Sequence, residues 1–165
     1  MSARVGSPIR VVVDTNVVLR GLLNVRSRSG RVLEAVERRL VLLLLSKPVV
    51  AEYRAVLTDA EVVRRFAELT PERVDMALRR LRFLGEYLRS VRTRFALARD
   101  PRDAMLIELA IAGRATDLVT GDDDLLSLPD GHDDAAKRLR QRMPMLRVMT
   151  PADFLNAHAS ELRTE

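Results

Sequence analysis

Cysteine and tryptophan are absent from this 165-residue sequence, and aromatic residues make up 4% of it. Without cysteine the chain cannot form disulfides or thiolate metal sites. No basic start followed by a long apolar stretch marks the first thirty residues, so a cytoplasmic location is expected. The longest apolar run, Leu40 to Leu45, is far shorter than the roughly 20 residues that cross a bilayer. We interpret it as a buried strand.

The sequence also has few lysines, and its excess of cations is almost entirely arginine. Its formal net charge is +5 and its pI is near 10.5, which favours a polyanionic partner such as nucleic acid. Lys47 and Lys137 are the only lysines. Arginine matches phosphate geometry better than lysine, although a GC-rich genome would produce the same bias. The two histidines, His132 and His158, lie in loop-like and terminal segments and are expected to be solvated.

Strand-like and helix-like stretches alternate along the chain, with no repeat or linker, so residues 1–165 are expected to form one domain. The β-branched stretch 9–13 and the apolar run 40–45 predict buried strands. The expected helices cover 31–39, 48–58, 59–69, 70–88, 103–112 and the stretch after 151, and the later strands cover 118–120 and 146–149. This alternation indicates an α/β fold with three layers, in which helices flank a mostly parallel central sheet.

Four acidic residues lie where predicted strands end or where the following helices begin. Asp14 and Asp122 each come just after the carboxyl end of an apolar strand. Glu52 lies one turn into the helix after another strand, and Asp103 is expected to open the helix that leads to Asp122. If the strands are parallel, all four lie at one edge of the sheet, where open α/β sheets bind ligands.

Carboxylate oxygens are hard ligands, and the sequence offers no cysteine or clustered histidine beside them. Such a set of ligands favours Mg²⁺ or Mn²⁺. One or two such ions could activate a water molecule against a phosphodiester and neutralise charge on the leaving oxygen. Asn16 and Thr120 are candidates for orienting ligands or water by hydrogen bonds. The sequence leaves the number of metal ions open.

Each of the aspartates also has a purely structural interpretation. Asp14 could close its strand in an Asx turn, whereas Asp103 and Asp122 could be helix N-caps, a role typically worth ~1 kcal/mol. Glu52 fits no capping position, and its helical neighbours are apolar, so its charge requires a partner. The position of Glu52 therefore favours the interpretation that the four acids form one shared site over the interpretation that each acid caps a separate element.

The chain resembles PIN-domain ribonucleases in four stretches. In chain order these are "VVDTNVVLRGLL", "KPVVAEYRAVL", "DPRDAMLIELAIAGRATDLVTGDDDLL" and "LRVMTPADFL". The similarity runs from about residue 9 to residue 155 and is specifically to the toxin components of bacterial toxin–antitoxin modules. It implies a PIN-like fold, a site for one or two Mg²⁺ or Mn²⁺ ions and endonucleolytic cleavage of single-stranded RNA. It also implies a cognate antitoxin protein as partner. A homo-oligomer, most simply a dimer, is the expected assembly.

The resemblance assigns roles to individual positions of this sequence. The catalytic and metal-binding acids that it implies are Asp14, Glu52, Asp103 and Asp122, with Asp124 as an accessory metal ligand. Asn16 and Thr120 match the polar helpers of the family.

Two features depart from the family pattern. Residues 127–145 form an insertion before the last strand, and it is predicted to add a turn and a short helix. Arg102 and Ala104 stand where related toxins often carry further acids, and this weakens the expectation of a second metal ion.

Two other functions fit parts of the sequence. A haloacid-dehalogenase-like phosphatase would use an aspartate nucleophile at the position of Asp14, but Asn16 replaces its general acid and Leu126 replaces its late second carboxylate. A catalytically weak or inactive PIN-fold module that binds RNA or a partner protein would keep the same carboxylates and basic charge. Metal-dependent cleavage of RNA separates these alternatives.

Arg26, Arg28 and Arg31, in the polar stretch after the first predicted strand, are candidates for contacts to RNA phosphates. Replacing Arg26 and Arg28 together by Ala should weaken single-stranded RNA binding. The slope of the logarithm of the binding constant against the logarithm of the salt concentration should also become less steep. The loss of two phosphate contacts, at about 0.7 each, accounts for the change. Fluorescence anisotropy over a salt series measures this slope, and an unchanged slope would remove both residues from the RNA interface.

Overall fold

The computed structural model describes residues 6–97 and 100–163, and within these residues five parallel strands form one sheet in the order β3-β2-β1-β4-β5. The strands are β1 (Arg10–Val13), β2 (Leu42–Ser46), β3 (Glu86–Leu88), β4 (Asp117–Val119) and β5 (Arg147–Met149). The α/β class expected from the sequence is confirmed.

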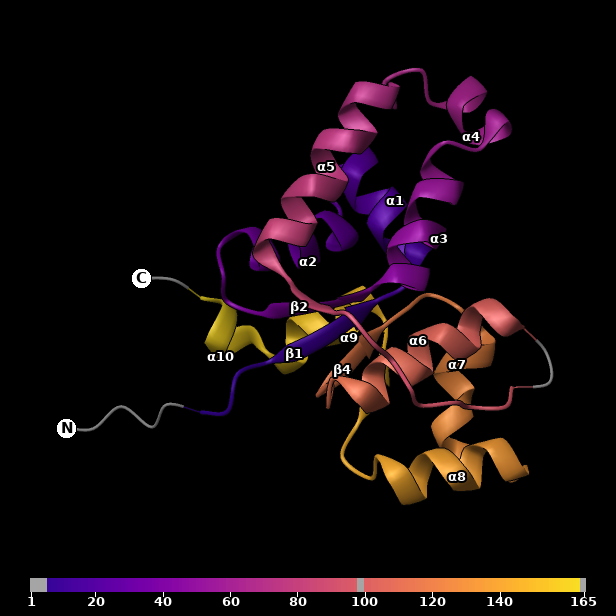
Figure 1. Ribbon diagram of the computed structural model, residues 1–165. Coiled ribbons are helices and arrows are strands. Elements are labelled where there is room, and N and C mark those ends of the chain that lie inside the picture. Colours follow the sequence, from indigo (N-terminus) through magenta and orange to yellow (C-terminus); the bar gives the residue numbers. More distant parts are fainter. Residues whose placement is uncertain (1–5, 98–99, 164–165) are drawn as a thin grey trace.

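Helices cover both faces of this sheet and form a three-layer arrangement (Figure 1). They are α1 (Thr15–Leu23), α2 (Arg28–Glu37), α3 (Lys47–Leu57), α4 (Ala60–Arg65), α5 (Pro71–Leu84), α6 (Pro101–Ala112), α7 (Asp123–Ser127), the 3-10 turn η1 (Leu128–Asp130), α8 (Asp134–Arg142), α9 (Pro151–Ala157) and α10 (Ala159–Leu162). Helix α6 packs against β1, β2 and β4, whereas α9 lies behind the sheet. In the described part of the chain, no helix combines the length and apolar character needed to cross a membrane.

Burial explains why the apolar runs become the central strands. Val11, Val12 and Val13 in β1 and Leu43 to Leu45 in β2 are almost completely inaccessible, as expected for parallel strands covered on both faces. The helix after β2 begins as the sequence predicts, because the hydroxyl of Ser46 accepts a hydrogen bond from the amide of Val49.

The strand order creates a topological switch point between β1 and β4. After β1 the chain adds β2 and β3 on one side, then crosses to add β4 and β5 on the other. Val13 and Val119 are register partners, so the segments that follow them leave the sheet side by side. Ligands of open parallel sheets bind in the crevice at this kind of position.

The expected helix over 70–88 is too long. Helix α5 ends at Leu84, and Glu86–Leu88 pair in parallel with β2 as the edge strand β3. The chain passes so close to β2 at Gly85 that a Cβ atom there would lie 2.7 Å from the carbonyl oxygen of Leu43. The sequence pattern shows the helical spacing but not this close approach of backbone to backbone.

The insertion over 127–145 forms η1 and α8, so the prediction of a turn and a short helix is confirmed. Arg140 donates hydrogen bonds to the carbonyl oxygens of Pro129 and Gly131, at 2.7 and 2.6 Å, and so holds the turn against the helix. In Figure 1 α8 lies at the bottom of the molecule, below α6 and α7.

The expectation that His158 is solvated is wrong. Its side chain is buried, and its Nε2 lies 3.0 Å from Oδ2 of Asp117, a fully buried carboxylate at the start of β4. The Nε atom of Arg147 lies 3.1 Å from the other oxygen, and the hydroxyl of Thr116 donates to Oδ2 at 2.7 Å. This cluster joins β4 and β5 to the C-terminal helices. His132 is exposed, as expected.

Replacing His158 by Ala should lower the free energy of unfolding by about 1–3 kcal/mol, because it leaves the buried carboxylate of Asp117 with fewer partners. Urea denaturation measures this change. The matched control is His132→Ala, an exposed position that should change stability by less than about 0.5 kcal/mol. Equal stability of the two variants would contradict this account of the cluster.

Candidate active site

The carboxylate of Asp14 lies at the carboxyl end of β1 and is 9% exposed. Although Asp14 is the N-cap residue of α1, its side chain makes no capping hydrogen bond. Its Oδ2 instead accepts a hydrogen bond of 2.6 Å from the hydroxyl of Thr120, which follows β4. The carboxylate of Asp14 therefore makes a buried contact across the switch point, in addition to local contacts with the backbone amides of Thr15 and Asn16 that act to lower its pKa.

Thr120 links this buried carboxylate to the acidic turn after β4. Its hydroxyl oxygen accepts from the amide of Asp122 at 3.0 Å while it donates to Asp14. Asp122 is the N-cap of α7, since its Oδ1 accepts from the amide of Asp124 at 2.8 Å. The capping interpretation of Asp122 is thus confirmed, and it places the carboxylate beside Asp14.

Tyr53 supports the same strand end, a role that the sequence pattern did not show. Its ring is fully buried, and its hydroxyl donates a hydrogen bond to the carbonyl oxygen of Val13. Burial, and then the nearby carboxylate of Asp14, raise the pKa of Tyr53, so the phenol stays protonated. The only sequence signal was a hydroxyl-bearing aromatic residue in the apolar stripe of α3. Its bond fixes α3, and with it Glu52, against β1.

Asp103 does not open α6 as expected. Asp100 is the N-cap, and its Oδ1 accepts from the amide of Arg102 at 2.9 Å, so Asp103 falls in the first helical turn. This shift removes the capping interpretation of Asp103. Burial and then repulsion from Asp122 and other carboxylates raise the pKa of Asp103 to about 6.

The residues predicted for the site meet at one cavity of about 140 Å³. The predicted members that line it are Asp14, Glu52, Asp103, Asp122 and Asn16. Asp124 instead lines a neighbouring cavity of about 870 Å³, which shares Asp103 with the first. The fold therefore brings four carboxylates from four separate segments to the switch point of the sheet.

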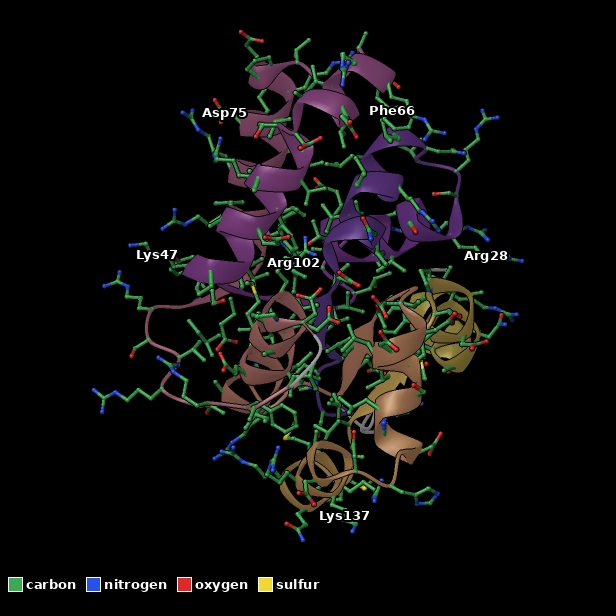
Figure 2. All side chains as sticks on the ribbon, turned by 90° about the vertical axis from the view of Figure 1, so that its right-hand side faces the viewer. Arg28, Lys47, Phe66, Asp75, Arg102 and Lys137 are labelled. Atoms are coloured by element: carbon green, nitrogen blue, oxygen red, sulfur yellow. The ribbon has the colours of Figure 1, made fainter. Side chains whose placement is uncertain are left out.

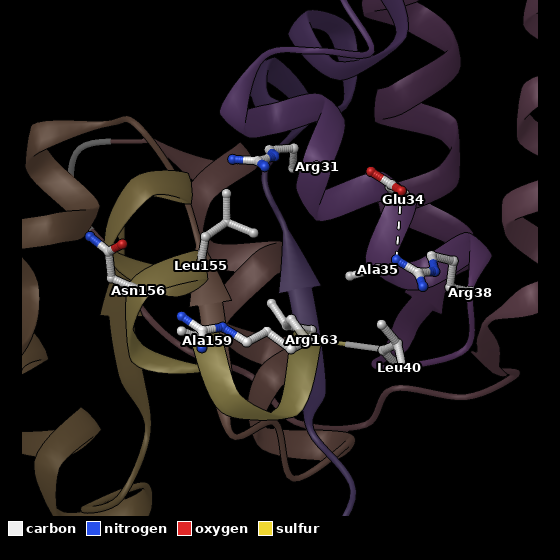
Figure 3. Close-up of a pocket in the computed structure, with 10 residues that line it drawn as sticks. Arg31, Glu34, Ala35, Arg38, Leu40, Leu155, Asn156, Ala159 and Arg163 are labelled. Atoms are coloured by element: carbon white, nitrogen blue, oxygen red, sulfur yellow. Dashed lines mark ion pairs between the residues drawn. The ribbon is translucent and has the colours of Figure 1, made fainter. Parts of the chain in front are cut away.

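The three arginines proposed for RNA lie elsewhere. Arg26 is exposed between α1 and α2, and Arg28 is exposed as the first residue of α2. Figure 2 places Arg28 at one side of the face whose centre carries Arg102. Arg31 lines a groove between α2 and the C-terminal helices, together with Leu155 and Arg163 (Figure 3). Among the described residues, the lining of the carboxylate cavity includes none of the three. Their contact with RNA stays a prediction.

A family model described as "PIN domain" matches residues 10–124, a span that contains all four carboxylates. The chain belongs to the PIN-domain family. PIN domains are generally nucleases, so the match favours a phosphodiester hydrolase over the dehalogenase-like phosphatase. Neither the curated proteins nor the solved structures include a significant match to this PIN domain.

The donor set of this PIN domain fits a hard divalent cation in its chemistry. All four side chains offer carboxylate oxygen, the ligand that Mg²⁺ and Mn²⁺ prefer. Burial and the charge of Asp122 raise the pKa of Asp14 despite the hydrogen bond from Thr120, so these acids repel one another. However, no three acidic or histidine side chains in residues 6–97 and 100–163 are close enough to hold one ion as they are placed.

Asp103→Asn should raise the melting temperature of the metal-free protein near pH 7.5 by a few degrees, because it removes a repelled charge. The sign follows from the pKa. A folded-state pKa of about 6, above the ordinary 3.8, means that the penalty is almost absent at about pH 3.5, grows as the pH rises between these two pKa values and is fully present above them. The higher melting temperature of Asp103→Asn relative to the wild type should therefore disappear at about pH 3.5.

The same melts with Mn²⁺ should show a smaller stabilisation of Asp103→Asn than of the wild type, since a ligand stabilises through its binding to the folded state. RNA cleavage should also be lost. The control is Asp123→Asn, an exposed neighbour that does not line the cavity. An Asp103→Asn protein that melts like the wild type and still cleaves RNA would refute the assignment of Asp103 to the site.

Proposed function

We propose that the protein is a Mg²⁺- or Mn²⁺-dependent endoribonuclease that cleaves single-stranded RNA. One observation carries the proposal: Asp14, Glu52, Asp103 and Asp122 line a single cavity at the switch point of a parallel sheet. Membership of the PIN-domain family supports hydrolysis of phosphodiesters. The net charge of +5 supports a polyanionic substrate.

In this proposal Asp14, Glu52, Asp103 and Asp122 hold the cation, and Asp124 assists from the neighbouring cavity. When bound, one or two Mg²⁺ or Mn²⁺ ions supply a Lewis acid that increases the acidity of water and neutralises charge on the phosphodiester. Thr120 fixes the orientation of the Asp14 carboxylate through its 2.6 Å hydrogen bond. Asn16 is exposed at the rim of the cavity, where its amide can orient water or substrate.

The biological role that we infer is that of the toxin in a toxin–antitoxin module, acting in the cytoplasm. Its support is the similarity of the four sequence stretches to such toxins. A cognate antitoxin protein and a homodimer belong to the same inference. Expression of the protein alone should then arrest growth, and the Asp14→Asn variant should not.

A second function is favoured by one contact. Arg102 faces Glu52 across 3.9 Å, so a cation of the chain itself already lies beside one of the proposed metal ligands. This is the arrangement expected of a catalytically weak or inactive PIN-fold module that binds RNA or a partner protein. Such a module would bind RNA without cleaving it, whether or not metal is added.

Purified protein should cleave a labelled single-stranded RNA when Mn²⁺ or Mg²⁺ is added, and excess EDTA should abolish the reaction. Re-addition of Mn²⁺ should restore it, which controls for unfolding by the chelator. Asp14→Asn, prepared in the same way, should remain inactive and so exclude a contaminating nuclease. Equal cleavage with and without EDTA would contradict the metal mechanism, and RNA binding without any cleavage would favour the second function.

A further inference from the structure

One arginine lies among the acids of the carboxylate cavity. Arg102 is the second residue of α6 and lines the same cavity as Asp14, Glu52 and Asp103. Its side chain is 66% exposed, so its guanidinium is accessible from solvent. In Figure 2 Arg102 lies near the middle of the face turned to the viewer, where the upper helices meet α6.

Asp100 holds one edge of this guanidinium. The Oδ1 atom of Asp100 accepts from the backbone amide of Arg102 at 2.9 Å and from its Nε at 3.3 Å, and Oδ2 accepts from Nη2 at 3.4 Å. The N-cap of α6 therefore also orients the arginine. A guanidinium carries five N–H donors, and this contact uses only those on the Nε–Nη2 edge.

The opposite end of the guanidinium, at Nη1, faces Glu52. Nη1 lies 3.9 Å from Oε1 of Glu52, which is an ion-pair distance but too long for a hydrogen bond. Within residues 6–97 and 100–163, Nη1 makes no hydrogen bond in this arrangement. Donors that are already oriented but not yet used are available to an anion that enters the cavity.

An RNA phosphate needs positive charge at this position. Five carboxylates line the cavity, because Asp100 joins the four proposed metal ligands, and they repel a polyanion unless cations offset them. Arg102 is the single cationic side chain that lines the cavity among the described residues. A planar guanidinium presents paired donors that match two phosphate oxygens, whereas an ammonium does not.

We propose that Arg102 binds a phosphate of the RNA strand at the mouth of the carboxylate cavity, with its orientation set by Asp100. This inference rests on the proposed function and adds a substrate contact to it. Arg102 thereby also explains how an acidic site accepts RNA although Arg26, Arg28 and Arg31 lie outside the cavity. A merely structural role, in which Arg102 only neutralises Asp100 and Glu52, would affect stability and not RNA.

The test compares wild type, Arg102→Ala and Arg102→Lys with a matched control, Arg64→Ala. Arg64 is also exposed and faces a glutamate, Glu61, at 3.8 Å, but it lies on α4, at the top of Figure 1 and away from α6. Two quantities are measured for each protein: the kcat and KM of single-stranded RNA cleavage with Mn²⁺, and the salt dependence of RNA binding. The binding series is done in an Asp103→Asn background, so that the RNA stays intact.

Arg102→Ala should lower kcat/KM by roughly 10- to 100-fold, mainly through KM, as expected when a hydrogen bond to a charged group is lost. The slope of its RNA binding constant against salt concentration, both on logarithmic scales, should fall in magnitude by about 0.7, as expected when one phosphate contact to a single strand is lost. Arg102→Lys should keep the salt slope of the wild type but recover only part of its RNA affinity, because lysine keeps the positive charge but lacks the paired donors of the guanidinium. Arg64→Ala should match the wild type in both measurements.

The outcomes separate this inference from the proposed function. If the wild type cleaves RNA and Arg102→Ala behaves like Arg64→Ala in KM and slope, Arg102 does not contact phosphate, although the ribonuclease assignment stands. If no protein cleaves RNA, the proposed function fails, yet a slope reduced only in Arg102→Ala still supports the phosphate contact. A lower melting temperature with an unchanged slope would assign Arg102 a structural role and overturn the inference.

Discussion

A carboxylate at the end of a fully buried strand has lost most of its hydrating water, so its charge depends on the groups that the fold brings to it. Asp14 is in this position, and Thr120 supplies a hydrogen bond from the neighbouring strand. Tyr53 holds the preceding carbonyl group from α3. These contacts come from segments about 40 and 106 residues away. The position of Asp14 therefore requires β1, β4 and α3 to be assembled together.

The same arrangement explains why the site favours cations. Burial, and to a lesser extent neighbouring carboxylates, raise the pKa of Asp14 and of Asp103, so the folded chain gains when a positive charge enters the cavity. Arg102 supplies one such charge from within the chain, and it remains exposed enough to meet a substrate. A divalent ion would offset more of the negative charge of the carboxylates, and a phosphodiester, itself an anion, could then approach. The proposed reaction and the proposed phosphate contact therefore follow from one electrostatic constraint.

Local patterns in the sequence were sufficient for the strands β1 and β2 and for the meeting of four carboxylates at one sheet edge. These features depend on apolar periodicity and on the rule that parallel strands end together. The edge strand β3, the buried state of His158 and the bond of Tyr53 depend on distant partners. For example, Asp117 meets His158 across 41 positions, and no local pattern encodes that contact. The start of α6 was misplaced because Asp100 and Asp103 are both suitable N-caps in sequence.

Direct observation of metal binding tests the central claim, that the cavity around Asp14 holds a divalent cation. Electron paramagnetic resonance of Mn²⁺ distinguishes the free ion from the protein-bound ion and does not depend on RNA or on turnover. Titration of Mn²⁺ into the wild type and into Asp123→Asn, whose carboxylate lies outside the cavity lining, should show saturable loss of the free-ion signal. Asp14→Asn should leave the signal of free Mn²⁺ almost unchanged. Binding by Asp14→Asn with the affinity of the wild type would contradict the account.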